Sequence, residues 1–334
     1  MQMLVKLFLI FTLFLLSPLS LAGTLDDVLK HGDIRCGVFP DDPGRSAIDS
    51  KGEWRGFYVD FCRAVAAAIF ADPKRVHFIE VGPQTRFSSL QERKADVVMY
   101  SSTWTMGREY NYDIAFPAIY LFDGQGIMVR KNSGINTLSD LAKKRICVTE
   151  NTTTHTTLVQ YLKTHNIDAE IFFANGDAFF RGSCDAYTAD RLNLAVNKAN
   201  RAEDPAAYHL LPERLSKEPI GPMVRADDPQ WARLVRAVID ALVLADEKLI
   251  SQRTVDQALL THSDLEVQNL LGKTGTIGAQ LGLQADWAAQ IIRSVGNYSE
   301  IYLRHFGPNT PVGVEQGVNQ PWNRGGLFYA PLFK

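Results

Sequence analysis

Apolar and polar positions alternate along the chain with two periods, one typical of strands and one typical of helices. Apolar residues predict a strand at 34–39, a helix at 57–70 and a second strand at 76–81. The alternation continues with a helix expected at 86–91, strands at 95–100 and 145–148, a helix at 152–165 and a strand at 169–173. This order predicts α/β lobes with mainly parallel central strands.

Two segments indicate crossings between lobes. In 120–126 an apolar run gives way to Asp123-Gly124-Gln125-Gly126, and glycines allow the backbone angles of a hinge. A second crossing is expected near 217–221, where two prolines punctuate the chain. Two crossings make the first lobe discontinuous. The predicted units are a first lobe of 23–122 and 221–264, a second lobe of 123–220, and an extension of 265–334 packed on the first lobe.

Helix ends are clear in the second half. Asp228 and Pro229 supply an N-cap and a first helical residue, and Gly296 closes an apolar helical pattern over 287–295. The stretch 307–334 is rich in proline and glycine. We expect it to run over the surface as irregular chain.

The first 22 residues have the features of an export signal. Lys6 is their only charge, 7–16 is an apolar run, and Ser20-Leu21-Ala22 offers the small residues Ser20 and Ala22 at the cleavage positions. The apolar run is too short for a bilayer, and no other stretch approaches about 20 uninterrupted apolar residues. We expect cleavage, a mature chain from near Gly23 and a periplasmic location; an uncleaved anchor is the alternative.

Composition excludes several classes of function. Without Lys6, the chain carries 34 basic and 37 acidic residues, a formal charge of −3. It therefore lacks the excess of basic residues that is typical of nucleic-acid-binding proteins. The hydrophobic fraction of 46% is ordinary for a globular protein, here of more than one lobe. The histidines show no metal-ligand spacing, and no serine lies in a nucleophile elbow. We expect a monomer without metal, cofactor or nucleic-acid partner.

The four cysteines, Cys36, Cys62, Cys147 and Cys184, are widely spaced in a chain expected to meet oxidising conditions. Sequence alone allows three pairings. We predict Cys36 with Cys62 and Cys147 with Cys184, because each bridge then lies within one lobe and leaves the lobes free to move.

Three polar stretches could together hold the carboxylate and ammonium of a free α-amino acid. An arginine offers a planar fork of donors to a carboxylate, a helix start favours an anion, and an aspartate at a strand end faces the cleft of an α/β sheet. Each has a plainer explanation, namely a solvated arginine, a cap without ligand, and a cap for the helix at 191–200. The stretches are 101–105 with Arg108, 151–154, and 185–190 ending in Asp190.

These residues resemble those of the substrate-binding proteins of polar amino-acid ABC transporters, bacterial solute-binding protein family 3, and most closely the general L-amino-acid-binding subgroup. Both cysteine pairs and the long C-terminal extension fit that subgroup. The resemblance implies a type II periplasmic-binding-protein fold, with two lobes, two hinge crossovers and a helical extension. It covers nearly the whole mature chain, including 24–38, 56–70, 123–130, 184–190, 296–300 and 322–331.

The resemblance also implies roles for the polar stretches. Arg108 and Thr153, with Thr152 beside it, would bind the α-carboxylate. The family usually has glycine where this chain has Asn151, which leaves the backbone path there open.

At the other pole, Asp190 would bind the α-ammonium, while Ser101 and Thr103 complete the contacts. Four further residues match the subgroup, namely Arg86, Phe87, Gln125 and Trp104. We expect Phe87 in the core and Gln125 at the hinge. Trp104 is expected either in the core or in the pocket wall.

The pocket for the ligand side chain departs from the family. The loop after the first strand commonly carries an aromatic or large apolar residue, but here it contains Asp41 and Asp42. These acids either select a polar or basic ligand or face water. In the second case the cover comes from Trp54, Phe57, Tyr58 or Trp104. The identity of the amino acid stays open.

The resemblance predicts a receptor that binds a free L-amino acid between its lobes and delivers it to an inner-membrane ABC permease. An exported enzyme on the same scaffold, such as a dehydratase using Glu150, is the alternative from another class. A partner of a sensor that feeds no transport is a third possibility.

Overall fold

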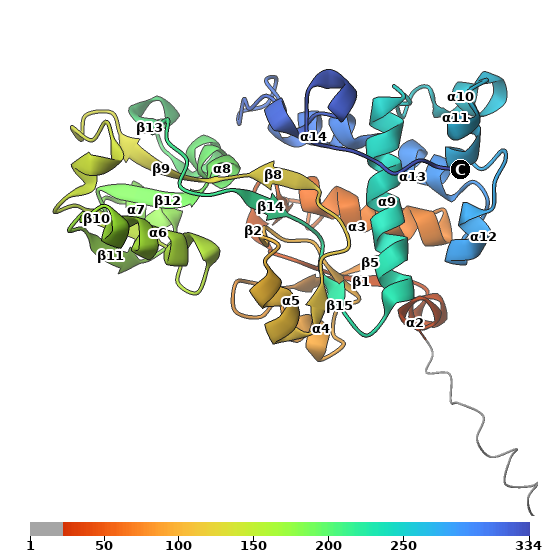
Figure 1. Ribbon diagram of the computed structural model, residues 1–334, viewed down its shortest axis with the longest axis horizontal. Coiled ribbons are helices and arrows are strands. Elements are labelled where there is room, and N and C mark those ends of the chain that lie inside the picture. The colour runs from red at the N-terminus through yellow and green to blue at the C-terminus, as the bar shows by residue number, and fades with distance from the viewer. Residues whose placement is uncertain (1–22) are drawn as a thin grey trace, which may run out of the picture.

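The computed structural model describes residues 23–334; the predicted export signal at 1–22 lies outside the described residues. Two α/β lobes lie side by side (Figure 1). The sheet of the first lobe places β1 (Ile34–Val38) between β5 (Val76–Glu80) and β6 (Val97–Val98), all parallel. Cys36 and Val38 of β1 are fully buried, as the apolar run predicts.

The sheet of the second lobe is mixed. Its parallel part sets β10 (Arg145–Val148) between β11 (Glu170–Phe173) and β12 (Ala186–Asp190). Two antiparallel strands follow, β9 (Gln125–Arg130) on β12 and β13 (Tyr208–Leu210) on β9. The ends of β6 and β12 lie next to each other across the two lobes, because Ser101 and Asp190, which follow or end these strands, are hydrogen-bonded.

Two short strands connect the lobes. Strand β8 (Leu121–Asp123) pairs antiparallel with β14 (Glu218–Ile220), within the two segments predicted as crossings. Gln125, fully buried beside them, donates from Nε2 to Thr154 O at 2.9 Å and to Thr188 Oγ1 at 2.8 Å. On the outer edge of β8, the Asn319 amide pairs with both backbone groups of Phe122. The exact lobe boundaries given above stay a prediction.

The longer helices follow the sequence pattern closely. Helix α3 (Phe57–Phe70) has the predicted bounds, and α6 (Thr153–Thr164) begins after the predicted cap. Helix α9 (Pro229–Glu247) is capped by Asp228, whose side chain accepts from Trp231 N at 2.9 Å. The other helices are α2 (Thr24–His31), α4 (Ser88–Gln91), α5 (Met106–Tyr112), α7 (Gly176–Phe180), α8 (Arg191–Arg201), α10 (Val255–Thr261), α11 (Leu265–Leu270), α12 (Ile277–Leu281), α13 (Trp287–Val295) and α14 (Tyr298–Phe306).

Two predicted elements are shorter than expected. The strand at 95–100 is reduced to β6, because Val98 turns to a single antiparallel bridge with Met223. The helix at 86–91 begins only at Ser88; residues 83–87 form turns, in which Arg86 N donates to Gly82 O. The remaining strands are β2 (Asp41–Asp42), β3 (Ser46–Ile48), β4 (Trp54–Arg55), β7 (Ile114–Ala115) and β15 (Val224–Arg225), and the short 3-10 turns are Leu138–Leu141, Pro205–Ala207, Gly317–Asn319 and Trp322–Arg324.

Both predicted disulfides are confirmed. Cys36 to Cys62 ties β1 to α3, and Cys147 to Cys184 ties β10 to the turn before β12. Each bridge lies within one lobe. In the chain-entropy model each contributes roughly 3.5 kcal/mol to the stability of its lobe.

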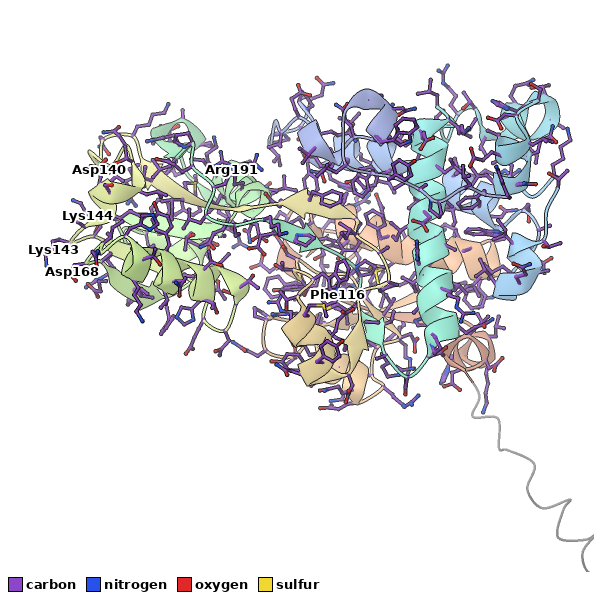
Figure 2. The ribbon with its side chains drawn as sticks, viewed as in Figure 1. Phe116, Asp140, Lys143, Lys144, Asp168 and Arg191 are labelled. Atoms are coloured by element: carbon purple, nitrogen blue, oxygen red, sulfur yellow. A yellow bond between two sulfur atoms is a disulfide. The ribbon has the colours of Figure 1, made fainter. Side chains whose placement is uncertain are left out.

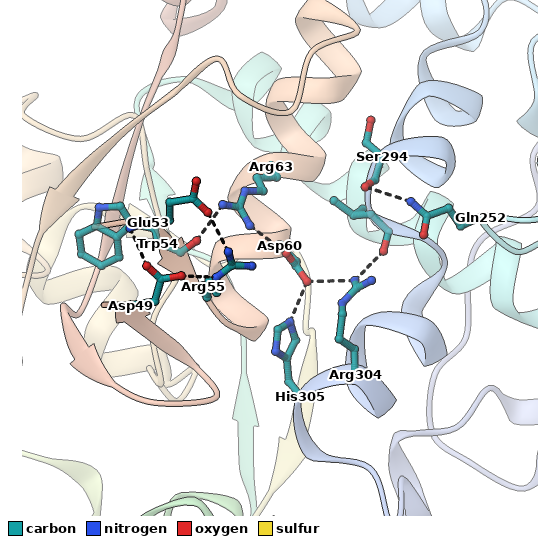
Figure 3. A network of polar contacts seen from close by, with 11 residues as sticks. Asp49, Glu53, Trp54, Arg55, Asp60, Arg63, Gln252, Ser294, Arg304 and His305 are labelled. Atoms are coloured by element: carbon teal, nitrogen blue, oxygen red, sulfur yellow. Dashed lines mark hydrogen bonds and ion pairs between the residues drawn. The ribbon is translucent and has the colours of Figure 1, made fainter. Parts of the chain in front are cut away.

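The C-terminal extension packs on the first lobe. Helix α13 lies against α3 and α9, and its residues join the same hydrophobic core. Asp60 of α3, 7% exposed, accepts from Arg304 at 3.0 Å and contacts His305 at 2.7 Å (Figure 3). Burial alone would raise the pKa of Asp60, but His305, Arg304 and Arg63 outweigh burial and lower it. The helical extension and the first lobe are therefore joined by both apolar and ionic contacts.

Of the helices within 23–334, none combines the length and apolar character that crossing a membrane requires. From Gly307 onward the chain forms only two 3-10 turns, as its proline and glycine content predicts.

Candidate functional site

A cavity of ≈ 90 Å³ lies between the lobes. This volume is well below the roughly 300 to 1,000 Å³ of pockets for drug-sized ligands, so it suits a small molecule. The lining residues come from both sides of the crossings: Pro83, Arg86, Tyr100, Ser101, Thr103 and Arg108 from the first lobe, and Thr149, Thr152, Thr153, Thr154, Tyr187, Thr188, Ala189, Asp190 and Asn193 from the second.

Arg108 is presented by the first turn of α5. Thr105 caps this helix, its Oγ1 accepting from Arg108 N at 3.1 Å. Arg108 Nη1 donates to Thr103 O at 2.6 Å, and its guanidinium lies 5.7 Å from the Phe87 ring centroid. Among the described residues, no carboxylate oxygen lies within 4.0 Å of Arg108. Burial lowers its pKa, against the nearby charges of Glu218 and Asp190. The remaining donors of Arg108 are available to an anion in the cavity.

The start of α6 faces Arg108 across the cavity. Thr152 is the N-cap: its Oγ1 accepts from His155 N at 3.1 Å and donates to Thr149 O at 2.6 Å. Its hydroxyl is therefore already occupied, whereas Thr153 Oγ1 points across the lobes to Thr103 Oγ1 at 3.2 Å. Asn151 has φ 59°, the left-handed conformation that glycine adopts without strain, so the glycine of the family is replaced without losing this turn.

Asp190 ends β12 at the opposite side of the cavity. Its side chain is buried, and Oδ2 accepts from Ser101 Oγ at 3.1 Å across the lobes. Asp190 precedes α8 but does not cap it; Leu192 N donates instead to Asp123 Oδ2 at 2.9 Å. Burial, then the charges of Asp123 and Glu218, raise the pKa of Asp190 to about 7. A ligand cation would neutralise this carboxylate.

Glu218 belongs to the site but was missed by the sequence analysis. It lies on the hinge strand β14, is 2% exposed, and accepts hydrogen bonds from Thr103 and Ser216 and, at 3.4 Å, from Thr153. One carboxylate of the hinge thus contacts a hydroxyl from each lobe. The available signal was an acidic residue directly before the Pro219-Ile220-Gly221 segment of the predicted crossing.

Arg86 was assigned no role by sequence, yet it lines the cavity. Around it, Pro83, Tyr100, Tyr187 and Asn193 form the wall beyond the polar groups described above. Burial, opposed mainly by the charge of Arg86, raises the pKa of Tyr100 to about 12, so its hydroxyl is neutral. This wall is where a ligand side chain would lie.

None of the six residues considered for the side-chain pocket is among those that line the cavity, namely Asp41, Asp42, Trp54, Phe57, Tyr58 and Trp104. Asp42 instead forms an ion pair of 2.8 Å with Arg45, which is 5% exposed. Asp41 is exposed and lies 3.1 Å from Arg201 of the second lobe.

The aromatic candidates lie elsewhere as well. Trp54 stacks on Phe78 with ring centroids 5.2 Å apart, Tyr58 is 1% exposed in the core, and Trp104 is 40% exposed. Their roles in ligand selection stay a prediction.

Two further features bear on chemistry. Glu150, the residue considered for catalysis, is exposed and is not among the cavity residues. Within residues 23–334 there is no group of three potential metal ligands.

Exposed ion pairs gather away from the cavity. Figure 2 shows Lys143 and Asp168, which form such a pair, at the outer end of the second lobe, while Arg191 lies nearer the crossings. Arg191 Nη1 donates to Leu211 O at 2.7 Å and so joins the start of α8 to the chain after β13. Exposed pairs contribute little to stability, whereas the charges in the cavity are largely withdrawn from water.

Comparison with known proteins gives consistent matches. The family model "Bacterial extracellular solute-binding proteins, family 3" matches residues 34–249. The General L-amino acid-binding periplasmic protein AapJ of Rhizobium johnstonii is 39% identical over 317 residues, covering 93% of this chain and 92% of the relative. The Glutamate/glutamine/aspartate/asparagine-binding protein BztA of Rhodobacter capsulatus is 37% identical over 318 residues, covering 94% of each.

Solved structures agree with these relatives. A periplasmic binding protein of an ABC transporter from Brucella ovis, with glutathione bound, is 37% identical with a TM-score of 0.91, covering 94% of this chain and 100% of that one. An ancestral amino acid-binding protein described as a precursor of cyclohexadienyl dehydratase is 25% identical with a TM-score of 0.57, covering 68% of this chain and 95% of that one. The type II periplasmic-binding-protein fold expected from the sequence is confirmed.

Proposed function

Because the chain belongs to the bacterial extracellular solute-binding proteins of family 3, we propose that it binds a free L-amino acid between its lobes and delivers it to an inner-membrane ABC permease. It does so in the periplasm as a monomer, after removal of the export signal. The names of the relatives support this function, since AapJ and BztA are both described as amino-acid-binding proteins.

One observation carries the proposal: Arg108 of the first lobe and Asp190 of the second line one cavity of ≈ 90 Å³. A zwitterion offers a carboxylate to the guanidinium fork and an ammonium to the aspartate. Thr153 and the α6 N-terminus add donors for the carboxylate. Ser101 and Thr103 complete the contacts at the two poles.

The same geometry explains how the ligand would close the lobes. Ser101 with Asp190 and Thr103 with Thr153 already meet across the cavity at 3.1 and 3.2 Å. An amino acid placed among them binds both lobes at once, which only the closed arrangement allows. Ligand therefore shifts the population toward closure.

The experiment is a thermal-shift screen against the common amino acids, followed by calorimetric titration of the best ligand. Removing one partner of a buried charge pair costs roughly 3 to 5 of the about 8 kcal/mol of a micromolar complex, so Arg108→Ala should lose measurable binding. Arg93→Ala is the matched control, because Arg93 is exposed and pairs with Asp227 away from the cavity. Wild-type affinity in the Arg108 variant would refute the proposed site.

Catalysis is the second candidate, since the ancestral relative is described as the precursor of a dehydratase and Asp190 has a pKa raised to about 7. A carboxyl near neutrality suits a general acid. We nevertheless expect binding without turnover, and recovery of the unchanged amino acid after prolonged incubation is the test that separates the two.

A further inference from the structure

Arg86 is a buried cation without a partner anion. Its side chain is 2% exposed and lines the cavity shared by Arg108 and Asp190. Nη1 donates to Pro83 O, but Nε has no hydrogen-bond partner in the described structure. No carboxylate oxygen of residues 23–334 lies within 4.0 Å of its guanidinium. Burying an unpaired charge is costly, which calls for a compensating group.

The neighbours of Arg86 are aromatic or cationic. Its Cζ lies 4.5 Å from the Phe87 ring centroid and 5.4 Å from that of Tyr100. Arg108 approaches the same Phe87 ring at 5.7 Å. Burial and the charge of Arg108 lower the pKa of Arg86 to about 10, which leaves it charged at neutral pH. Aromatic faces stabilise a cation only partly, so the positive charge is not balanced locally.

We propose that Arg86 binds a second carboxylate of the ligand, so that the cavity selects a free acidic amino acid, L-aspartate or L-glutamate. This inference rests on the proposed function: once Arg108, Thr153 and Asp190 hold the α-groups, the ligand side chain points to the remaining wall, where Arg86 lies.

The chemistry favours an acid over its amide. A carboxylate can accept two parallel hydrogen bonds from a guanidinium and neutralises it, whereas the amide of glutamine or asparagine leaves the charge in place. Glutathione also carries a second carboxylate, but a cavity of ≈ 90 Å³ suits a single amino acid better than a tripeptide. The free dicarboxylic amino acid is therefore the ligand that we infer.

The test compares acid and amide on the same protein. Calorimetric titrations with L-glutamate, L-glutamine, L-aspartate, L-asparagine and glutathione are run on wild type, Arg86→Gln and Arg86→Lys. We expect wild type to bind each acid at least tenfold more tightly than its amide. In Arg86→Gln the acids should weaken by about 100-fold while the amides change by less than about threefold, as expected when a charged hydrogen-bond partner is lost. Arg86→Lys should keep part of the preference.

The ratio of acid to amide affinity does not depend on the fraction of folded protein, because both ligands meet the same preparation. Arg225→Gln is the matched control: Arg225 is another buried arginine of the first lobe, but it donates to Thr24 and Ala95 outside the cavity. It should lower stability and leave the ratio unchanged.

Four outcomes are distinguishable. Loss of the acid preference in Arg86→Gln alone supports the inference. An unchanged ratio in that variant overturns it while leaving amino-acid binding intact. Weakening of glutathione alone would overturn the free amino acid as the ligand. Failure of wild type to bind any amino acid would overturn the proposed function itself.

Discussion

The two lobes differ in what supports them and in what they bring to the cavity. The first lobe shares one large core with α13 and α14 of the extension. The second lobe has separate, smaller clusters around its sheet. Apart from Ile220 on the crossing strand β14, its members of the larger core are Leu192 and Val196 of α8. The first lobe supplies the cations Arg86 and Arg108; the second supplies Asp190 and the hydroxyl of Thr153.

This difference suggests a division of labour. The larger body can hold the ligand carboxylates before closure, because its arginines need no contribution from the other lobe. The smaller body, joined through β8 and β14, then adds the ammonium partner and the helix start. We therefore expect changes at Arg86 of the first lobe to alter which ligand binds, and changes at Arg108 or in the second lobe to weaken every amino acid.

The largest effect is expected from Asp190→Asn. It leaves the ligand ammonium buried without an anion, which should cost roughly 3 to 5 kcal/mol of binding free energy. Calorimetry with the best ligand measures this. Asp168→Asn is the control in the same lobe, since Asp168 pairs with Lys143 at its exposed outer end. If the two variants bind the ligand with equal affinity, Asp190 does not contact the ligand.

Removing the disulfides sharpens the comparison of the cores. Cys147→Ser with Cys184→Ser should lower the stability of the second lobe by roughly 3.5 kcal/mol. Because that lobe has its own clusters, we expect calorimetric unfolding to split into two transitions. The corresponding change at Cys36 and Cys62 should instead lower the transition of the larger body. One shared transition with equal shifts in both variants would contradict separate cores.

Affinity should depend on pH through Asp190. Its pKa is raised to about 7 in the empty protein, so the carboxyl is protonated on the acidic side. An ammonium binds the ionised form and lowers this pKa, so binding releases a proton. Affinity should therefore rise about tenfold per pH unit below 7 and level off above it.

The stability of the folded protein changes with pH in the opposite direction to the affinity for ligand. An acid with a pKa raised above its unfolded value of about 3.9 favours folding most below that value, and this contribution is lost as the pH rises through about 7. Titrations of the wild-type protein with ligand at several pH values measure the binding effect. A midpoint near 6 instead of 7 would assign the proton to another group, such as Asp123, whose pKa is raised to about 6.

The smallest effect is expected at the outer contact between the lobes. Arg201 of the second lobe donates to Asp41 O at 2.7 Å and pairs with Asp177 of its own lobe at 3.1 Å. Partly exposed pairs contribute up to about 1 kcal/mol, so Arg201→Ala should weaken every ligand by less than about fivefold. The acid to amide ratio should not move. Small-angle scattering should show a slightly more open empty protein, and a change in ligand preference would contradict this role.

Local signals in the sequence were sufficient for much of this molecule. The bounds of α3 and the cap at Asp228 follow from periodicity and from residues within one turn of each element, whereas the binding roles of Arg108 and Asp190 were predicted from the family resemblance. The rule that strand ends meet at one edge of a sheet explains why Asp190 faces the cavity. The family resemblance then predicted that this aspartate and the distant Arg108 bind opposite poles of one ligand.

What sequence reasoning missed depends on contacts between distant segments. Glu218 meets Thr103, 115 residues away, because Ile220 of the same strand β14 forms a β-bridge with Thr103. Arg86 is buried only because the turn from Gly82 and the cavity wall enclose it. Conversely, Asp42 was considered for the pocket, but the neighbouring Arg45 takes it into an ion pair. The positions of Glu218 and Arg86 depend on tertiary packing, which local patterns do not encode, whereas the pair of Asp42 and Arg45 joins residues three positions apart.

The central claim is that one amino acid bridges the two lobes through both of its charged poles. A crystal structure of the complex with L-glutamate tests it most directly. The account predicts the α-carboxylate on Arg108 and Thr153 and the ammonium on Asp190, with both lobes in contact with the ligand. A ligand held by one lobe alone, or with its ammonium remote from Asp190, would contradict it.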